Sequence, residues 1–291
     1  MTSVPSPETI PVRDGTRLAV LRWSEPSADG VPVVLVHGLA SNARLWDGAA
    51  RSLSECGHGV IAVDLRGHGQ SDKPDHGYSV GDVADDVADV LVVLAREGWT
   101  RPLVCGQSWG GNVVVELAAR HGAAVRGVVA VDGGTIELSR MFPRWEDCES
   151  ALAPPRLEGM PFERLRSLIA ASHPDWSEEA VDGQMHNMER LDDGTIRPWL
   201  LRRRHMTILR SLWEHSPASL WASIEVPVLF TTAIGDDAQS RAKREQIADA
   251  LAALGRADVA WFEGADHDLH AQYPRRFADV VDAQVRTGIF A

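Results

Sequence analysis

Residues 103–110 read LVCGQSWG, a short apolar run followed by a G-x-S-x-G motif. The run predicts a buried strand, and residues 109–121 predict a helix that follows it directly. A strand that turns abruptly into a helix leaves little room for side chains, which explains Gly106 and Gly110. Such a turn strains the central serine and exposes its hydroxyl at the carboxyl edge of a sheet. Ser108 is therefore a candidate nucleophile, and a glycine-rich turn with a capping serine is the alternative interpretation.

Apolar runs alternate with helical stretches on both sides of this motif, up to Asp132 and again after Val226. This alternation predicts βαβ units and a mainly parallel sheet. The expected parallel strands are residues 32–36, 60–63, 103–105, 125–131, 226–232 and 259–262. Residues 9–12 and 17–23 flank Asp14-Gly15, which predicts an antiparallel hairpin at the N-terminal edge. A capping box at Ser79 and Asp82 predicts a helix that ends near Gly98.

The segment between Gly133 and about Ile224 lacks strand-like runs, and we expect a helical insertion because a structureless loop of this length would be improbable. The insertion leaves the sheet at its carboxyl edge, so we expect it to cover Ser108 as a lid. Its tryptophans fit either the core of this small unit or the wall of an apolar substrate pocket. They are Trp145, Trp176, Trp199, Trp213 and Trp221. Arg202, Arg203 and Arg204 fan out around a predicted helix, so a solvated face is expected, and one of them could bind a substrate carboxylate.

Composition narrows the class of protein. Acidic residues outnumber basic ones 41 to 29, and the net charge of -12 would repel phosphate backbones, so nucleic acid is not an expected partner. Three widely spaced cysteines without C-x-x-C indicate neither a disulfide framework nor a zinc site, and they fit a reducing cytoplasm. The first ten residues lack a basic start and an apolar run, and no apolar stretch approaches the roughly 20 residues of a membrane span. We expect a cytoplasmic protein that acts on a small molecule without membrane, metal or cofactor, and no heptad pattern indicates its oligomeric state.

A serine nucleophile needs an imidazole to take its proton and an acceptor that holds the imidazole in one tautomer. With a G-x-S-x-G turn placed between strand and helix, the chain resembles the α/β-hydrolase superfamily, in its capped serine hydrolase branch. The resemblance implies a mainly parallel eight-stranded sheet with a helical cap inserted after the sixth strand. It divides the chain into a core of residues 1–134 and 225–291 and a cap of residues 135–224. The family's chain order is serine, acid, histidine.

His267 ends the stretch Gly264-Ala265-Asp266-His267, which looks like the family's terminal G-x-x-H loop. The family usually takes its acid from the turn after the penultimate strand, which implies Asp236. Asp237 is one residue away, and Asp132 ends an earlier strand where some relatives carry the acid, so both remain alternatives.

Carboxylates near His267, together with His270, would be the basis of a metal site. The spacing lacks a fourth ligand and the helical H-E-x-x-H pattern, so no metal is expected. We expect His270 to pack or to orient its neighbours instead.

The stretch His37-Gly38-Leu39 resembles the family's H-G-x oxyanion loop. The resemblance implies that the backbone amides of Leu39 and Trp109 stabilise the oxyanion of a tetrahedral intermediate. His37 is expected to be a buried, hydrogen-bonded support. Residues 64–72, DLRGHGQSD, resemble a segment that braces the loop after the fourth strand, and no direct catalytic part is expected for His68.

The resemblance implies a serine esterase that cleaves an ester-like bond, in a carboxylic ester, a thioester or a lactone, through an acyl-enzyme. Serine at position 108 argues against the aspartate-based haloalkane dehalogenases and epoxide hydrolases. The same triad would also serve carbon-carbon bond hydrolysis or acyl transfer. Some proteins with this fold bind small molecules without catalysis, which leaves a binding protein as a third hypothesis.

Overall fold

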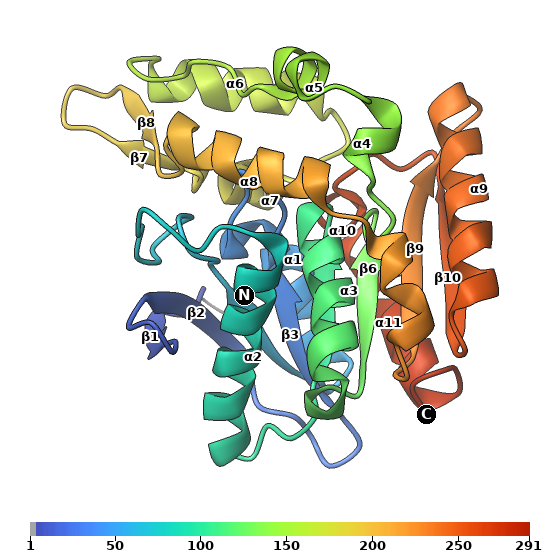
Figure 1. The fold of residues 1–291 in the computed structure, drawn as a ribbon. Coiled ribbons are helices and arrows are strands. Elements are labelled where there is room, and N and C mark those ends of the chain that lie inside the picture. Colours follow the sequence, from blue (N-terminus) through green and yellow to red (C-terminus); the bar gives the residue numbers. More distant parts are fainter. Residues whose placement is uncertain (1–3) are drawn as a thin grey trace.

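An eight-stranded sheet with helices on both faces forms the centre of the computed structural model, which describes residues 4–291 (Figure 1). The strand order is β1-β2-β4-β3-β5-β6-β9-β10. The strands are β1 (Glu8–Pro11), β2 (Arg17–Ser24), β3 (Pro32–Val36), β4 (Gly59–Val63), β5 (Leu103–Gln107), β6 (Gly127–Val131), β9 (Val228–Ile234) and β10 (Ala257–Glu263). Strands β1 and β2 pair antiparallel at one edge, and every pair from β4 to β10 is parallel. The expected mainly parallel sheet with an antiparallel N-terminal edge is confirmed.

Helices cover the sheet on both faces, which is why its central strands are apolar throughout. The core helices are α1 (Asp47–Glu55), α2 (Val80–Arg96), α3 (Trp109–His121), α9 (Ala238–Ala253), α10 (Leu269–Gln272) and α11 (Pro274–Arg286), with 3-10 turns η1 (Ala43–Trp46) and η2 (Gly122–Ala124). Val34 and Val36 of β3 pack in the cluster that contains residues of α2, α3 and α9. Val33 and Leu35 pack in the opposite cluster with residues of α1 and α11. Alternate side chains of one strand therefore fill two separate cores.

Helix α2 begins at the predicted capping box. The Ser79 hydroxyl accepts a hydrogen bond from Asp82 N at 3.0 Å, and the Asp82 carboxylate accepts one from Ser79 N at 3.1 Å. Val83, Val87 and Leu94 lie on its buried face. The helix ends just before Gly98, as the sequence predicts.

The cap is inserted in the chain between β6 and β9, and it lies above the carboxyl edge of the sheet (Figure 1). It contains α4 (Leu138–Met141), α5 (Trp145–Leu152), α6 (Phe162–Ser172), α7 (Glu178–Met185), β7 (Met188–Arg190), β8 (Ile196–Pro198), α8 (Arg202–Glu214), η3 (Pro217–Ser219) and η4 (Trp221–Ser223). The expectation of a strand-free insertion is wrong at β7 and β8, which pair antiparallel. Asp193-Gly194 closes this hairpin with Gly194 at a φ of 80°, so the Asp-Gly pair was the available sequence signal.

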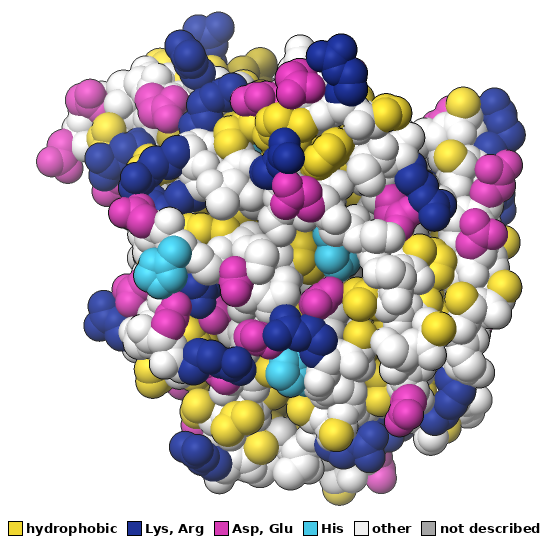
Figure 2. All heavy atoms as spheres, viewed as in Figure 1, with side chains coloured by type: hydrophobic (Ala, Val, Ile, Leu, Met, Phe, Trp, Pro, Cys, Tyr) yellow, Lys and Arg dark blue, Asp and Glu magenta, His cyan; other side chains and the backbone are white. Residues whose placement is uncertain are grey.

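Charged side chains of both signs are scattered over the face shown in Figure 2, with hydrophobic side chains between them in the cap. Three of the exposed large hydrophobic residues belong to the cap, namely Met141, Leu152 and Leu168. Within residues 4–291, none of the helices has the length and hydropathy of a bilayer-spanning segment.

Replacing Ser79 with alanine tests the contribution of the capping box. The variant should lose about 1 kcal/mol of unfolding free energy, because one amide at the helix start loses its acceptor. Urea unfolding followed by circular dichroism measures the loss. Ser167→Ala is the matched control, because the Ser167 hydroxyl is exposed within α6 and bonds to the Glu163 carbonyl. Equal stability of Ser79→Ala and the unaltered protein would contradict the assigned contribution.

Candidate active site

Ser108 occupies the turn between β5 and α3 with φ 55° and ψ -120°. A positive φ is strained for a serine and persists only where the surroundings enforce it. The backbone here is crowded: a Cβ at Gly106 would lie 2.1 Å from the carbonyl oxygen of Gly110, and one at Gly110 would lie 2.4 Å from that of His37. Ser108 N donates to the carbonyl of Val131 at 2.8 Å, which fixes the turn to the neighbouring strand β6. Ser108 thus lies at the N-terminus of α3, where the helix dipole favours negative charge.

The imidazole of His267 is hydrogen-bonded to a buried carboxylate. Its Nδ1 donates to Oδ2 of Asp132 at 2.6 Å. Asp132 follows β6 directly and is only 5% exposed. The carboxylate also accepts from Lys243 Nζ, 2.7 Å from each oxygen, and from the backbone N of Ala233 at 3.1 Å. Three separate segments of the chain therefore hold one carboxylate in place beside the histidine.

This arrangement corrects the expectation that Asp236 contacts the imidazole. Asp236 is exposed in the loop between β9 and α9. Asp237 caps α9 by accepting from Ser240 N at 2.7 Å. Asp132, the alternative at the end of the earlier strand, is the carboxylate that His267 contacts. Strand β6 lies directly beside β5 in the sheet, so the residue after β6 ends next to the Ser108 turn, whereas the residues after β9 lead into a helix.

His267 reaches the same edge of the sheet as Ser108. Gln107, which precedes Ser108, donates from Nε2 to the carbonyl oxygen of His267 at 3.3 Å. The side chain of His267 is 52% exposed, while that of Asp132 is 1% exposed. The imidazole is therefore open to a small molecule on one side and anchored on the other.

Local charges set the ionisation of this pair. Desolvation opposes the charged ring of His267, but the hydrogen bond to Asp132 and the negative charges of Asp268 and Asp132 outweigh it, so its pKa lies above the ordinary value. The positive charge of Lys243 acts in the opposite direction on that pKa. Burial would raise the pKa of Asp132, but the hydrogen bond and charge of His267 and the charge of Lys243 hold it below its ordinary value. Asp132 is therefore held as a carboxylate, and it supports a His267 imidazole that can accept a proton.

Two buried histidines hold the loop that follows β3. His37 Nδ1 donates to the Gly38 carbonyl at 2.7 Å, and its Nε2 accepts from Leu65 N at 3.0 Å. His68 Nε2 accepts from Ala40 N at 3.3 Å. Burial lowers the pKa of His37 to about 4, and burial followed by the charge of His37 lowers that of His68 well below its ordinary value. Both rings are neutral supports near neutral pH, in the position where the sequence predicts a support.

The amides of Leu39 and Trp109 fit the predicted oxyanion hole. Neither amide donates to another backbone or side-chain group within residues 4–291. Trp109 N belongs to the first residue of α3, and Leu39 lies in the loop after β3, packed against the same hydrophobic cluster as Trp109. Two unpaired donors at the Ser108 edge are suited to an oxygen that becomes negative during a reaction.

Residues 64–72 brace the loop that follows β3. Asp64 accepts from Ala43 N at 2.7 Å and from Gln70 N at 2.8 Å. Arg66 forms a buried ion pair with Asp86 of α2. The segment therefore ties the loops after β3 and β4 to a core helix, which agrees with its predicted bracing part.

Asp266, the neighbour of His267, links the histidine loop to the cap. Its Oδ2 accepts from His173 Nδ1 at 3.0 Å and from Trp176 Nε1 at 2.9 Å. His173 follows α6 and Trp176 precedes α7, so both donors belong to the cap. Any movement of this part of the cap would therefore act on the segment that carries His267.

The other residues singled out in the sequence either pack in the interior or line a cavity. His270 is buried and lies on the Trp46 ring with 3.9 Å between ring centroids, so it packs as expected. Among the five cap tryptophans, Trp221 joins the main core, Trp213 bonds from Nε1 to the Phe142 carbonyl at 2.7 Å, and Trp199 lines a cavity.

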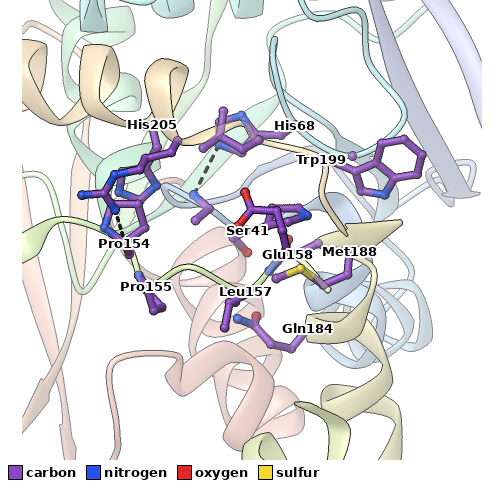
Figure 3. A pocket seen from close by; sticks show the side chains of 16 residues that line it. Ser41, His68, Pro154, Pro155, Leu157, Glu158, Gln184, Met188, Trp199 and His205 are labelled. Carbon is purple, nitrogen blue, oxygen red and sulfur yellow. Dashed lines mark hydrogen bonds between the residues drawn. The ribbon is translucent and has the colours of Figure 1, made fainter. Parts of the chain in front are cut away.

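That cavity, of about 170 Å³, lies between the cap and the loops after β3 and β4 (Figure 3). Ala40, Ser41 and His68 form its core side, and neither Ser108 nor His267 lines it. It begins next to Leu39, since consecutive Cα atoms are about 3.8 Å apart. The cavity therefore lies beside the loop that carries Leu39, and Ser108 and His267 are not among its lining residues.

The expected solvated face for the three consecutive arginines is wrong for Arg204. Arg202 lines the cavity and bonds to the Pro154 carbonyl. Arg203 and Arg204 both pair with Asp75, at 2.7 and 2.8 Å, and Arg204 is buried because it also bonds to the Lys73 carbonyl at 2.6 Å.

Lys243 is the residue that sequence reasoning missed. A lysine on a predicted surface helix carries no local signal of a buried partner. Its contact with Asp132 becomes visible only when β6, β9 and α9 are placed side by side.

Known proteins share this architecture over most of the chain. Residues 33–280 match the Alpha/beta hydrolase family. A non-heme chloroperoxidase of Streptomyces lividans is 28% identical over 279 residues, covering 91% of this chain and 95% of that protein. A 2-(acetamidomethylene)succinate hydrolase of Mesorhizobium japonicum is 40% identical over 172 residues, 58% of each chain.

Solved structures support the same conclusion. The crystal structure of an E-2-(acetamidomethylene)succinate hydrolase superposes with a TM-score of 0.73 and 25% identity, covering 95% of this chain and 98% of that one. With its eight-stranded sheet, its strained serine turn and its match over residues 33–280, the chain belongs to the α/β-hydrolase family.

Proposed function

We propose that this protein is a serine hydrolase that cleaves an ester-like bond of a small molecule, in a carboxylic ester, a thioester or a lactone. The observation that carries the proposal is the 2.6 Å hydrogen bond between His267 and buried Asp132, next to a serine held in a strained turn. An imidazole fixed in one tautomer is what a serine hydroxyl needs to become a nucleophile. The substrate is expected to meet the protein in the cytoplasm.

The proposed reaction gives each of these groups one part. His267 takes the proton of the Ser108 hydroxyl while Oγ forms a bond to the carbonyl carbon. The carbonyl oxygen becomes negative and accepts from the amides of Leu39 and Trp109, each worth about 3 kcal/mol in comparable sites. The bond to the leaving group breaks as that group takes the proton from His267. Asp132 stabilises the imidazolium throughout.

Water completes the cycle. His267 takes a proton from water, the hydroxide oxygen bonds to the acyl carbon, and the acyl-oxygen bond to Ser108 breaks as the serine regains its proton. The products are a carboxylic acid and the free enzyme, and no cofactor enters the balance.

A carbon-carbon bond hydrolase or an acyl-transfer enzyme on the same triad is the second candidate. The 40% identity over 172 residues to a 2-(acetamidomethylene)succinate hydrolase favours keeping it, since that protein's substrate is not named as an ester. A small-molecule-binding protein without catalysis is the remaining alternative. A complete serine, histidine and carboxylate set argues against that alternative.

The nucleophile is tested with p-nitrophenyl acetate. Ser108→Ala should lower kcat/KM by at least roughly 10³-fold, because the acyl-enzyme loses its attachment point. Ser167→Ala on the cap surface is the matched serine control and should retain the full rate. A fluorophosphonate probe followed by mass spectrometry should label Ser108. Equal rates in Ser108→Ala and the control would favour a binding protein.

The acid is tested by three amide substitutions. Asp132→Asn should lower kcat by roughly 10⁴-fold, because the amide no longer holds His267 in the required tautomer. Asp236→Asn and Asp237→Asn should leave kcat within about twofold, since asparagine caps a helix nearly as well as aspartate. Steady-state kinetics on the same ester measures all three. Loss of activity confined to Asp236→Asn would show that Asp236 is the acid, as the sequence predicts.

Lys243→Met tests how the Lys243 charge, paired with Asp132, affects the pKa of His267. His267 acts as a base only when neutral, so kcat/KM should rise as the pH passes upward through its raised pKa. The Lys243 charge lowers that pKa, so its removal should move the acidic limb of the pH-rate profile to higher pH. Lys243→Arg keeps the charge and should leave the limb close to its original position. A limb that stays in place or moves to lower pH in Lys243→Met would contradict this part for Lys243.

A further inference from the structure

A second hollow lies at the amino edge of the sheet, remote from the cap, where the parallel strands begin (Figure 1). It is lined by Arg101, Arg126 and Arg256 together with Pro227 and residues 289–291, and its volume is about 220 Å³. Arg101 stands two residues before β5, and Arg126 and Arg256 directly precede β6 and β10. The strand order β5-β6-β9-β10 therefore gathers three arginines that are far apart in the chain. We call this place the arginine hollow.

The three arginines have no acidic partner in the described part of the chain. None of them forms an ion pair with a carboxylate of residues 4–291 within 4.0 Å. The acidic residues nearest to them in sequence, Glu225 and Asp258, do not line the hollow, and Asp258 accepts from Gln284 Nε2 at 2.9 Å instead. Acidic residues outnumber basic ones 41 to 29 in this chain, so partners for arginine are abundant elsewhere. Three positive charges therefore remain available to an anion from outside.

Backbone carbonyls orient each guanidinium. Arg126 Nη1 and Arg256 Nη2 donate to the carbonyls of residues 290 and 289, at 3.0 and 2.9 Å respectively. Nε and Nη2 of Arg101 share the Val125 carbonyl, at 3.3 Å each. A guanidinium has five N–H donors, so each of the three keeps donors without an acceptor among the described residues. The cations are thus held in place with donors left over for a ligand.

The backbone of Arg101 is strained. Its φ is 48°, in the left-handed region that residues with a Cβ rarely adopt. Among residues 4–291, the other non-glycine residues with a positive φ are Ala40, Ser108 and Asp132. Those three belong to the candidate active site and the loop beside it. Strain of this kind clusters at functional sites, so the strain at Arg101 supports a second functional site in the arginine hollow.

The arrangement favours a phosphate group as the ligand. Guanidinium donors match the oxygens of both phosphate and carboxylate groups. The three arginines start from three different strands, and neighbouring strands are about 4.8 Å apart, so their side chains reach the hollow from different directions. A carboxylate presents two oxygens in one plane, whereas a phosphate ester presents three acceptor oxygens and a charge of about -1.5 to -2 at pH 7. One phosphate group can therefore accept from several of these arginines at once.

We propose that the arginine hollow binds the phosphate group of a small molecule through Arg101, Arg126 and Arg256. With a net charge of -12, the rest of the protein repels a long polyanion, so the ligand is a small phosphate ester or a diphosphate and not a nucleic acid. The site does not depend on the proposed hydrolase reaction. Ser108 lies at the carboxyl ends of the strands, whereas the arginines precede the strands at their amino ends.

Calorimetric titration of the full-length protein, in a phosphate-free buffer of low ionic strength, tests the site. The probes are pyrophosphate and citrate, two small polyanions that carry their charges on phosphate and on carboxylate groups. Pyrophosphate should bind at least about tenfold more tightly than citrate, because its tetrahedral groups accept from several guanidiniums. Ser108→Ala should bind pyrophosphate with unchanged affinity, since the substituted residue lies at the opposite edge of the sheet.

Arg101→Gly removes one guanidinium and relieves the positive φ, because glycine adopts that conformation without strain. This variant should bind pyrophosphate at least about tenfold more weakly, while its thermal unfolding stays close to that of the unaltered protein. Arg126→Gln should weaken pyrophosphate to a similar extent. Arg164→Gln is the matched control, because Arg164 is exposed on α6 in the cap and forms no ion pair within the described residues. The control should bind pyrophosphate like the unaltered protein.

Four results would each overturn the phosphate site. They are no binding of pyrophosphate, equal affinity for pyrophosphate and citrate, unchanged pyrophosphate affinity in either folded hollow variant, and equal weakening in Arg164→Gln. Loss of pyrophosphate binding in Ser108→Ala would place the ligand at the active site and would also overturn it. If Arg101→Gly does not fold, Arg126→Gln decides the outcome.

The two proposals fail in different experiments. Equal ester rates with and without the Ser108 hydroxyl would contradict the hydrolase and leave the arginine hollow untouched. A protein that hydrolyses p-nitrophenyl acetate through Ser108 but does not distinguish pyrophosphate from citrate keeps the hydrolase and loses the phosphate site.

Discussion

The buried carboxylate of Asp132 is the constraint on which the arrangement of this site depends. A charge removed from water is costly unless it is paired and hydrogen-bonded. Here His267, Lys243 and the Ala233 amide provide the partners, and they come from the C-terminal loop, α9 and β9. The need to satisfy one carboxylate therefore draws three distant segments to the end of β6, and one of them carries His267, whose carbonyl accepts from Gln107 beside Ser108.

The same site is connected outward to the cap. Asp266 precedes His267 and accepts from His173 and Trp176, so the loop that carries the base is fixed to cap residues as well as to the sheet. On the other side, the loop after β3 is held by two neutral histidines and opens into the cavity beneath the cap. The position of the cap thus bears on both the loop that carries His267 and the cavity beside the loop after β3.

Most of the architecture followed from local signals. The apolar runs predicted each central strand, the capping box at Ser79 predicted the start of α2, and the glycines around Ser108 predicted the turn. The hairpin β7–β8 was missed although Asp193-Gly194 marks it, because its strands are short and only partly apolar. The acid was misplaced for a different reason. Asp132 and Asp236 both follow strands that end at the same edge, so spacing along the chain does not separate them.

The sequence by itself determined the fold and the glycine-flanked turn that carries Ser108. These features depend on contacts between near neighbours and on the alternation of strand and helix, which a linear pattern contains. Only the tertiary structure decided which carboxylate meets His267, that Lys243 joins it, and that Ser41, Gln184 and Asn187 share a cavity. Those pairings depend on strand adjacency and on how the cap rests on the core, and both are properties of packing between residues far apart in the chain.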